Sequence, residues 1–492
     1  MSAAALRIRR PAIYPGVVSK HFDLAIIGTG SGNSIIGPEF ADLSIAVVED
    51  GLFGGTCLNV GCIPTKMFVH PAELADGVRH GRDLNVALEL NSVDWRGMRD
   101  RIFGRIDAIE AGGRRYRESA ENPNVTVFAG RGTFTGHKRL AIALHSGEQT
   151  EITAERWVLA AGSHAVVPDI PGLHDDSVTV HTSDTVMRID ELPASVIIVG
   201  GGYIAAEFGH VFSSFGSEVT QINRGERLLS RQDDDVSAAF TAAAAARYRV
   251  LCGTTLSAVK PAANGGVSVH YEGAHGAGTI TADLLLVATG RQPNGPGLKV
   301  TATGVQLDEA DRVVVDDYQR TGVDGIFALG DISTHWPLKH VANLEARVVK
   351  HNLLHPDAPM RADHRFVPAA VFTDPQVATV GRTERELIDG GVPYVSKTQR
   401  YGDIAAGWAR EDTADFAKVL ADPATGLLLG AHVIGPEAAT VIQPFIHAMH
   451  FGQTAHEVAL GQYWIHPALS ELVENALLGL PEPTGPGSTD RG

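Results

Sequence analysis

The sequence predicts an α/β protein that contains two Rossmann-like dinucleotide-binding units. Two short apolar runs, residues 22–28 and 195–200, each lead directly into a glycine-rich turn. This arrangement is typical of a buried parallel strand that feeds a phosphate-binding loop. The chain has 492 residues, enough for about three domains of roughly 150 residues each, so a third domain is expected beside the two units.

The composition excludes several classes of protein. The chain carries 41 Lys and Arg against 57 Asp and Glu, a net charge of −16, and it has no basic run, so neither nucleic acid nor an anionic membrane surface is expected as a partner. No apolar stretch approaches the ~20 residues of a membrane span. Three cysteines are too few for a disulfide scaffold, which favours a reducing, cytoplasmic compartment.

The two ends of the sequence differ from the rest. Residues 1–20 are basic but lack the apolar segment of a secretory signal, so we expect a flexible N-terminal extension. Residues 479–492 are rich in Pro, Gly and Ser, a composition typical of a disordered tail.

The first unit begins with the turn Gly28-Thr29-Gly30-Ser31-Gly32-Asn33. A second apolar run, residues 44–49, ends at Glu49, 21 residues after Gly28. In the dinucleotide fingerprint the turn and the following helix bind the pyrophosphate, and an acid at this distance binds the ribose. The match is imperfect, because Asn33 replaces the third glycine and Pro38 interrupts the expected helix. An ordinary glycine-rich turn is the alternative.

The second unit begins at Gly200-Gly201-Gly202-Tyr203-Ile204-Ala205. Its next strand, expected over residues 217–222, is followed by Asn223, 23 residues after Gly200, where an NAD site would carry an acid. Arginines follow instead, and their guanidinium groups suit the 2′-phosphate of NADPH. The alternative is a solvated loop. The arginines are Arg224, Arg227 and Arg231.

Two dinucleotide sites in one chain indicate two cofactors, one held permanently and one that exchanges. A third strand-like run, residues 325–331, ends in Asp331, which can place a carboxylate at the ribityl chain of a flavin. Two further strand–turn segments, residues 157–162 and 284–290, flank the second unit. We expect the chain to leave and re-enter the first domain there, so that an NADPH domain is inserted into a discontinuous FAD domain.

The stretch GGTCLNVGCIPTK, residues 54–66, contains a close pair of cysteines, Cys57 and Cys62. In a regular helix they would lie about 7.5 Å apart along the axis, and a disulfide needs Cα atoms within about 4.4–6.8 Å, so a bridge requires a distorted turn that the glycines can supply. Pro64 suits an early helix position, which places Cys62 where a helix N-terminus stabilises a thiolate.

Two buried, inert cysteines are the alternative. No further Cys or paired His lies nearby, so no metal site is expected, and Cys252 is interpreted as a plain buried cysteine.

The last constellation is HPALSE, in which His466 precedes Glu471 by about one helical turn. The acid could orient the imidazole and raise its basicity, as in an acid–base dyad. Spacing alone leaves this open, since a lone histidine is more often structural or exposed.

These motifs together resemble those of the pyridine nucleotide–disulfide oxidoreductases, the family of glutathione reductase and dihydrolipoamide dehydrogenase. The resemblance covers about residues 21–480 and is carried by GGTCLNVGCIPTK, GGGYIAAE, ATG, GIFALGD and HPALSE. Within the family, GTGSGNSII, CIPTKMFV, STHWPLKHVANLEARVVKHNLLHP, FVPAAVFTDPQVATVG and RYGDIAAGWA are similar to an actinobacterial branch that reduces the disulfide of a sugar-bearing thiol.

The resemblance implies catalytic roles. Cys57 would be the interchange thiol that attacks the substrate disulfide, and Cys62 the charge-transfer thiol against the flavin. His466, oriented by Glu471, would be the general acid–base, supplied by the other subunit of a homodimer with shared active sites. Lys66 and Glu207 would form an ion pair near flavin N5. Tyr203 would gate the nicotinamide pocket.

The resemblance also implies the cofactor contacts. Asn33 and Ala161 depart from the commoner Gly and Thr, and Arg347 occupies a place near the disulfide site in relatives. FAD would be held by Gly28, Gly30, Gly32, Asn33, Glu49, Gly55, Thr56, Lys66, Gly162 and Asp331. NADPH would be held by Gly200, Gly202, Tyr203, Ala205, Arg224, Arg227 and Gly290.

The implied organisation is an FAD domain in two parts, an inserted NADPH domain and a C-terminal α+β dimerisation domain. The expected boundaries are residues 1–20 for the extension, 21–165 and 291–362 for the FAD domain, 166–290 for the NADPH domain, 363–478 for the dimerisation domain and 479–492 for the tail.

The implied reaction is NADPH-driven, FAD-dependent reduction of a small disulfide. Dihydrolipoamide dehydrogenase is the main alternative, although its NAD site would want an acid at position 223. Mercuric reductase and the large thioredoxin reductases need extra C-terminal redox residues, and no cysteine follows Cys252. A soluble transhydrogenase would not need the cysteine pair. A non-catalytic flavoprotein subunit is a further alternative, which the intact set of Cys57, Cys62 and His466 disfavours.

Overall fold

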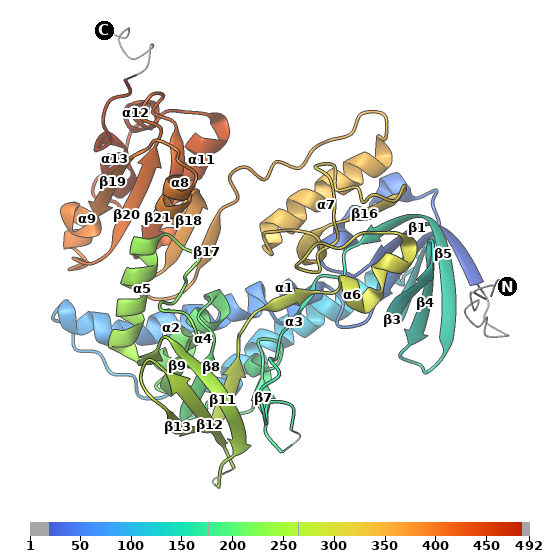
Figure 1. The fold of residues 1–492 in the computed structure, drawn as a ribbon, viewed down its shortest axis with the longest axis horizontal. Helices are drawn as coiled ribbons and strands as arrows, with labels where there is room; N and C mark the ends of the chain where they lie inside the picture. The colour runs from blue at the N-terminus through green and yellow to red at the C-terminus, as the bar shows by residue number, and fades with distance from the viewer. Residues whose placement is uncertain (1–18, 176, 264, 485–492) are drawn as a thin grey trace, which may run out of the picture.

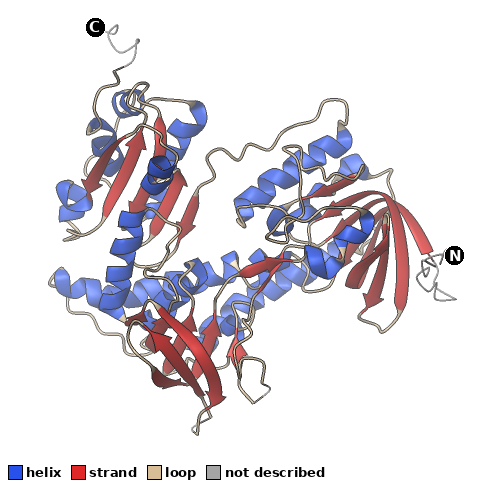
Figure 2. Ribbon diagram, viewed as in Figure 1, coloured by secondary structure: helices blue, strands red, loops and turns tan. Residues whose placement is uncertain are grey.

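The computed structural model describes residues 19–175, 177–263 and 265–484. Three bodies, each built around a β-sheet, are distinct in Figure 1: an N-terminal body in blue, teal and yellow, a green body below it, and a C-terminal body in orange and red. Each of the three combines β-strands with helices (Figure 2). Among the described helices, none is long and apolar enough to cross a membrane.

Six strands form the first sheet, in the order β1 (Ser19–Ile27), β2 (Ile45–Glu49), β3 (Val125–Gly136), β4 (Arg139–Leu144), β5 (Gln149–Leu159) and β16 (Ile326–Ala328). β1 also pairs with β5, in parallel. Leu24 and Ile26 are fully buried against α7 (Lys339–Leu354). Ala25 packs into a cluster on the other face. Burial on both faces is what the apolar run at residues 22–28 predicts.

The helix expected after the first glycine turn is replaced by two short 3-10 helices, η1 (Ser31–Ile35) and η2 (Pro38–Phe40). Pro38 lacks the N–H that a continuous helix would need. The carbonyl groups freed by the break bind the buried guanidinium of Arg117, which donates to Asn33 O at 2.8 Å and Ile36 O at 3.2 Å. Arg117 Nε also donates to Asn33 Oδ1 at 2.9 Å. Asn33 therefore helps to anchor the turn to α3 (Trp95–Arg117).

The second sheet is parallel, with the order β10 (Arg249–Leu251), β9 (Glu218–Ile222), β8 (Ser195–Val199), β14 (Leu284–Val287) and β7 (Val180–His181). Two helices, α4 (Tyr203–Ser214) and α5 (Asp234–Arg247), and a three-stranded antiparallel sheet complete this body. The antiparallel strands are β11 (Thr254–Pro261), β12 (Val267–Gly273) and β13 (Gly278–Ala282).

The second body is inserted into the first. The chain leaves the first sheet after β5 and returns to it at β16, and the second sheet is formed in between. At the crossing, β6 (Ser163–Ala165) pairs antiparallel with β15 (Arg291–Pro293). The segment after β15 contains α6 (Gly295–Leu298), η4 (Val300–Thr303) and η5 (Gly330–Ile332). The predicted fold class, two dinucleotide-binding units with one inside the other, is confirmed.

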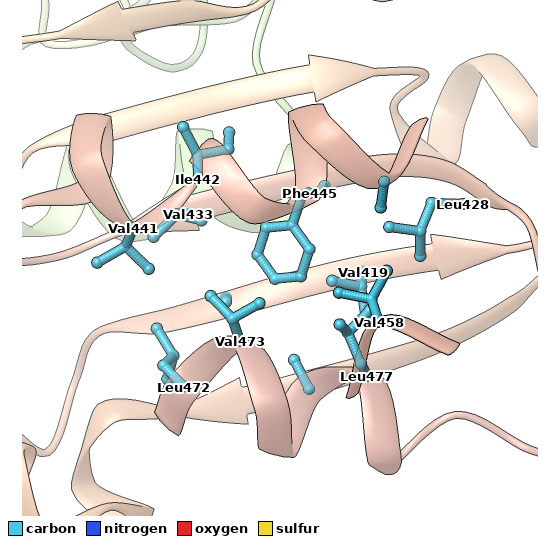
Figure 3. Close-up of a cluster of buried hydrophobic side chains, with 14 of the residues drawn as sticks. Val419, Leu428, Val433, Val441, Ile442, Phe445, Val458, Leu472, Val473 and Leu477 are labelled. Carbon is cyan, nitrogen blue, oxygen red and sulfur yellow. The ribbon is translucent and has the colours of Figure 1, made fainter. Parts of the chain in front are cut away.

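The third body has an antiparallel sheet in the order β17 (Ala369–Val371), β18 (Val377–Gly381), β21 (Leu428–Ile434), β20 (Phe416–Ala421) and β19 (Val395–Arg400). Figure 3 shows its core, where Phe445 lies among aliphatic side chains such as Val419 and Leu477. Phe445 and Leu477 are fully buried. The helices of this body are α8 (Glu384–Asp389), η6 (Tyr401–Asp403), α9 (Ala405–Trp408), α10 (Ala438–Val441), α11 (Gln443–Phe451), α12 (Ala455–Leu460) and α13 (Glu471–Leu478).

Two expectations about the ends of the chain are partly wrong. β1 begins at Ser19, so residues 19 and 20 belong to the sheet and not to an extension. Leu480 is 4% exposed and belongs to the C-terminal core, and Thr484 N donates to Pro423 O at 3.0 Å. The tail expected from residue 479 is therefore structured as far as residue 484, because one leucine in a polar stretch suffices to anchor it. Residues 1–18 and 485–492 lie outside the described residues.

Candidate active site

A cavity of about 1350 Å³ lies where the first glycine turn, the cysteine stretch, α4 and the start of α7 meet. It is larger than the pockets of about 300–1,000 Å³ that are usual for small ligands, and it is lined by both apolar and charged groups. Twelve of the residues predicted for catalysis or cofactor binding line it: Gly28, Gly30, Glu49, Gly55, Thr56, Cys57, Cys62, Lys66, Gly162, Tyr203, Glu207 and Asp331.

The cysteine pair occupies a break between two helices. Cys57 lies in the short α1 (Gly55–Asn59), and Cys62 is the first residue of α2 (Cys62–Asp83), as the sequence predicts. Gly61 lies between them, and a Cβ there would approach Thr56 O to 2.9 Å and Cys57 Cα to 3.3 Å. Only glycine therefore lets the chain turn back so closely on Cys57. Both thiols are free in this structure and hydrogen-bond to each other.

The surroundings give the two thiols opposite acidities. A hydrogen bond from Cys57 is the largest influence on Cys62 and lowers its pKa to about 7; burial opposes this, and the charge of Lys66 assists it. The hydrogen bond to Cys62, burial and the charge of Cys62 all raise the pKa of Cys57. The first negative charge therefore forms on Cys62, at the N-terminus of α2, where the helix dipole favours it.

Lys66 and Glu207 form the expected ion pair, with Lys66 Nζ 2.6 and 2.7 Å from the two carboxylate oxygens. Glu207 is 3% exposed and also accepts a hydrogen bond from Phe372 N at 3.0 Å. Lys66 Nζ lies 4.6 Å from the centroid of the Phe372 ring. The pair thus joins α2, α4 and the start of the C-terminal body beside Cys62.

The cavity has the features that FAD requires. Gly28 has a φ of +96°, and a Cβ there would come within 2.3 Å of Ala160 O, so the turn presents bare backbone. Glu49 accepts hydrogen bonds from Thr29 N at 2.8 Å and Thr29 Oγ1 at 2.6 Å, which fixes its carboxylate at the turn. Asp331 is held by Ser163 Oγ at 2.7 Å. A bare turn flanked by two oriented acids fits a flavin dinucleotide.

Two residues predicted for FAD, Gly32 and Asn33, lie behind the turn and do not line the cavity. A Cβ on Gly32 would come within 2.6 Å of Ala160 Cβ, and Asn33 binds Arg117 as described above. Both act by shaping the turn. Arg347 is exposed on α7 and does not line the cavity either. Cys252 is half-buried and not fully buried as expected.

The second glycine turn lies at the start of α4, and Tyr203 extends from it into the cavity. Burial raises the pKa of the Tyr203 phenol to about 12. Asn223 Nδ2 donates to Gly225 O and Arg227 O, both at 2.9 Å, and so closes the loop after β9. Gly200, Gly202, Ala205, Arg227 and Gly290 lie outside the cavity.

Arg224 and Arg227 differ in their freedom to bind a phosphate. Arg227 Nη1 donates to Asp234 O at 3.1 Å and lies 3.5 Å from Asp234 Oδ1. Arg224 is exposed and has no hydrogen bond or ion pair with any described residue. Of these two, Arg224 is the one whose guanidinium is available.

His466 and Glu471 form the pair that their spacing suggests, with 2.5 Å between His466 Nδ1 and Glu471 Oε1. The His466 side chain is 70% exposed, and neither residue lines the cavity that holds Cys57. Within one chain, the structure does not bring the histidine to the cysteines.

Several cavity residues were missed by the sequence analysis. Lys339, the first residue of α7, donates to Ser31 Oγ at 2.8 Å. Arg291 donates to Ser163 O at 2.7 Å and lies 3.6 Å from Asp184 Oδ1. Each contact joins segments more than a hundred residues apart, so no local spacing signals it.

Comparison with known proteins agrees with this site. The family model described as pyridine nucleotide-disulphide oxidoreductase matches residues 22–346, and the model of its dimerisation domain matches residues 367–477. Mycothione reductase of Mycobacterium tuberculosis is 49% identical over 467 residues, which cover 93% of this chain and 99% of the relative. Mercuric reductase of Streptomyces lividans is 32% identical, with 91% and 94% covered. Dihydrolipoyl dehydrogenase of Corynebacterium glutamicum is 30% identical, with 94% and 98% covered.

Among solved structures, the Cu(II) complex of the HOCl-induced flavoprotein disulfide reductase RclA from Escherichia coli superposes with a TM-score of 0.81. It is 26% identical, and the match covers 93% of this chain and 99% of that one. The chain therefore belongs to the pyridine nucleotide-disulphide oxidoreductases, enzymes that use FAD and a pyridine nucleotide, and carries their dimerisation domain at its C-terminal end.

Proposed function

We propose that this enzyme uses NADPH to reduce mycothione, the disulfide of mycothiol. The observation that carries the substrate is the 49% identity with mycothione reductase over nearly the full length of both chains. The mercuric reductase and dihydrolipoyl dehydrogenase relatives are 32% and 30% identical. Asn223, in place of the acid of an NAD site, further disfavours a dihydrolipoyl dehydrogenase.

FAD held in this cavity would supply the electron pair of NADPH to the Cys57–Cys62 disulfide. In the resulting dithiol, the negative charge rests on Cys62, whose pKa is about 7. Cys57 then attacks the substrate disulfide, and the proton of its thiol passes to His466. The imidazolium formed there protonates the first substrate sulfur, which leaves as a thiolate. The Cys62 thiolate then attacks the Cys57 sulfur of the mixed disulfide. This closes the Cys57–Cys62 bond and releases the second substrate sulfur as a thiolate.

The cofactor contacts follow the cavity. Glu49 would bind the adenosine ribose of FAD and Asp331 its ribityl chain, while Lys66 would lie near the flavin ring. Arg224 would bind the 2′-phosphate of NADPH, and Tyr203 would cover the nicotinamide pocket. Gly28, Gly30, Gly55, Thr56 and Gly162 would supply backbone contacts to FAD, and Gly200, Gly202, Ala205 and Gly290 those to NADPH.

The proposed active form is a homodimer in which each site combines Cys57 and Cys62 of one subunit with His466 and Glu471 of the other. Two observations support this: residues 367–477 match a dimerisation domain, and His466 is exposed away from the cysteine cavity. The domain boundaries at residues 165, 290 and 362 and a location in the cytoplasm are proposed with it.

An assay panel tests the substrate and the cofactor together. Purified enzyme is supplied with NADPH or NADH and with mycothiol disulfide, glutathione disulfide or lipoamide, and kcat/KM is measured for each pair. We expect the highest value for NADPH with mycothiol disulfide. A higher value for NADH with lipoamide would overturn the proposed substrate and identify a dihydrolipoyl dehydrogenase, with the fold and the redox cysteines unchanged.

A further inference from the structure

Lys339 is a half-buried cation in the active-site cavity without a carboxylate partner. Its ammonium group donates to Ser31 Oγ at 2.8 Å, and it forms no ion pair with any described residue. The other Lys and Arg side chains of the cavity each have an acid nearby: Lys66 with Glu207, Arg291 with Asp184 and Arg131 with Asp50. An unneutralised charge at this depth needs a further explanation, since burial of an ammonium group is unfavourable.

Close packing of the backbone brings Lys339 to the side of Cys57. Gly30 and Gly55 are in contact, since a Cβ on Gly55 would lie 2.7 Å from Gly30 Cα. Ser31 follows Gly30, and Cys57 comes two residues after Gly55 in α1. Lys339 is bound to Ser31, and its charge acts on Cys57 across this contact.

Ser31 holds the ammonium group in a defined position. Its hydroxyl donates to Asn343 Oδ1 at 3.0 Å, one turn further along α7, which leaves the oxygen lone pairs for Lys339. Ser31 is 8% exposed. The chain Asn343–Ser31–Lys339 is therefore a built arrangement that keeps the charge in the cavity.

We propose that Lys339 is the positioning residue of the exchange thiol, whose ammonium group stabilises the thiolate of Cys57 while it attacks the disulfide. This rests on the proposed disulfide reduction. In that step the Cys57 thiol gives its proton to a base, and its sulfur forms a bond with one sulfur of the substrate. The substrate S–S bond breaks, and the other sulfur leaves with the electron pair as a thiolate that takes up the proton.

Each of the two thiols is then stabilised as a thiolate by its own lysine, Cys62 by Lys66 and Cys57 by Lys339. Lys66 acts on Cys62, but Glu207 offsets part of its effect. For Cys57, the hydrogen bond to Cys62, burial and the charge of Cys62 raise the pKa, and Lys339 is the cation that lowers it. Without Lys339, only the backbone hydrogen bond from Cys62 would still favour a negative charge on Cys57, and attack would depend largely on the base.

The test is alkylation of the NADPH-reduced holoenzyme by iodoacetamide across a range of pH, with the rate at Cys57 followed by mass spectrometry. An opposite charge within about 4–6 Å favours the charged form of an acid and lowers its pKa by about 1–3 units, so removal of the charge raises the pKa. In Lys339→Met and Lys339→Gln the midpoint for Cys57 should rise by about one pH unit. At a fixed pH below the midpoint, the rate of Cys57 alkylation should fall about three- to fourfold. The fraction of Cys57 present as thiolate falls, and the higher nucleophilicity of a thiolate with a higher pKa offsets only part of that loss. Lys339→Arg should restore the midpoint.

Lys350→Met is the matched control, because Lys350 lies on the same helix and pairs with Glu39 at 3.2 Å outside the cavity; its midpoint should not move. Flavin content is measured on every variant. Unchanged midpoints in Lys339→Met and Lys339→Gln would overturn the proposal, and so would loss of FAD from both, which would assign Lys339 to the cofactor. No disulfide substrate is used, so the outcome is independent of whether mycothione is the substrate.

Discussion

Lys66 and Glu207 meet beside Cys62 although 141 residues separate them in the chain. The ammonium group lies 2.6 and 2.7 Å from the two carboxylate oxygens, and Glu207 is 3% exposed. The hydrogen bond from Cys57 lowers the pKa of Cys62 most and burial opposes it. Of the two partners in the ion pair, Lys66 lowers this pKa further and Glu207 raises it. The contact is thus both a link between the first two bodies and a control on the redox thiol.

Substitution of the two partners should move the pKa of Cys62 in opposite directions. In Lys66→Met the favourable charge is lost, and the pKa should rise from about 7 by about one unit. In Glu207→Gln the opposing charge is lost, and the pKa should fall below 7. Ultraviolet titration of the thiolate in the reduced enzyme measures both. Shifts of the same sign would show that the pair acts through the fold and not through its charges.

Lys418 is a buried cation that joins the second body to the third. It is 3% exposed and lies 2.9 Å from Asp233, 2.7 Å from Asp235 and 2.7 Å from Glu384. Lys418→Met would leave Asp233, which is fully buried, without its cation, a change that costs about 3–5 kcal/mol. Urea denaturation followed by circular dichroism should show an earlier midpoint. Lys350→Met, which breaks a more exposed pair with Glu39, should change stability by less than about 1 kcal/mol.

The same cluster predicts a loss of stability in acid. Burial acts to raise the pKa of Asp233, but hydrogen bonds from Lys418 and the Glu384 amide outweigh it, and the value lies below the usual 3.8. The hydrogen bond from Lys418 lowers the pKa of Glu384 below 4.5. Carboxyl groups with lowered folded-state values stabilise the protein above their unfolded values, and this stabilisation is lost as the pH falls through the folded ones. The melting temperatures of wild type and Lys418→Met should therefore converge below about pH 4, and a constant difference would contradict this account.

Arg224→Ala should remove the preference for NADPH. A hydrogen bond to a charged phosphate contributes roughly 1.5–3 kcal/mol, so kcat/KM for NADPH should fall by about one to two orders of magnitude. Activity with NADH should barely change, because NADH has no 2′-phosphate. Steady-state kinetics with both nucleotides provide the comparison. Equal losses with both would mean that Arg224 supports the loop after β9 and not the phosphate.

Much of the fold could be predicted because its signals are local. The strand before Gly28 and the strand before Gly200 are apolar runs that end in glycine turns, and both formed where expected. The start of α2 at Cys62 followed from Gly61 and Pro64, which act within one turn. Such signals depend on a few neighbouring residues.

What the sequence did not reveal depends on contacts between distant segments. The role of Asn33 became clear only with Arg117, 84 residues away. No local pattern distinguishes Lys339 from other helical lysines, because its partner Ser31 lies 308 residues earlier in the chain. Leu480 looked like part of a disordered tail because its pocket is formed by the rest of the C-terminal body. The roles of these residues depend on packing between distant segments, which produces no pattern in the neighbouring sequence.

A shared active site can be tested by mixing inactive subunits. Cys57→Ser and His466→Ala homodimers should each be nearly inactive in disulfide reduction, since each lacks one of the two groups in both sites. A mixed dimer contains one intact site, with Cys57 from the His466→Ala chain and His466 from the Cys57→Ser chain. Its second site lacks both groups.

Co-expression of the two variants should therefore restore activity that neither has alone. A statistical mixture makes about half of the dimers mixed, and each mixed dimer has one working site out of two, so about a quarter of wild-type activity is expected if the sites act independently. Differently tagged chains allow the mixed dimers to be isolated and assayed directly. If Cys57 and His466 of a single chain formed each site, no mixed dimer would hold a complete one. Activity no higher than the sum of the two variants, in a sample shown to contain mixed dimers, would rule out the shared site and require His466 to reach the cysteine cavity of its own chain.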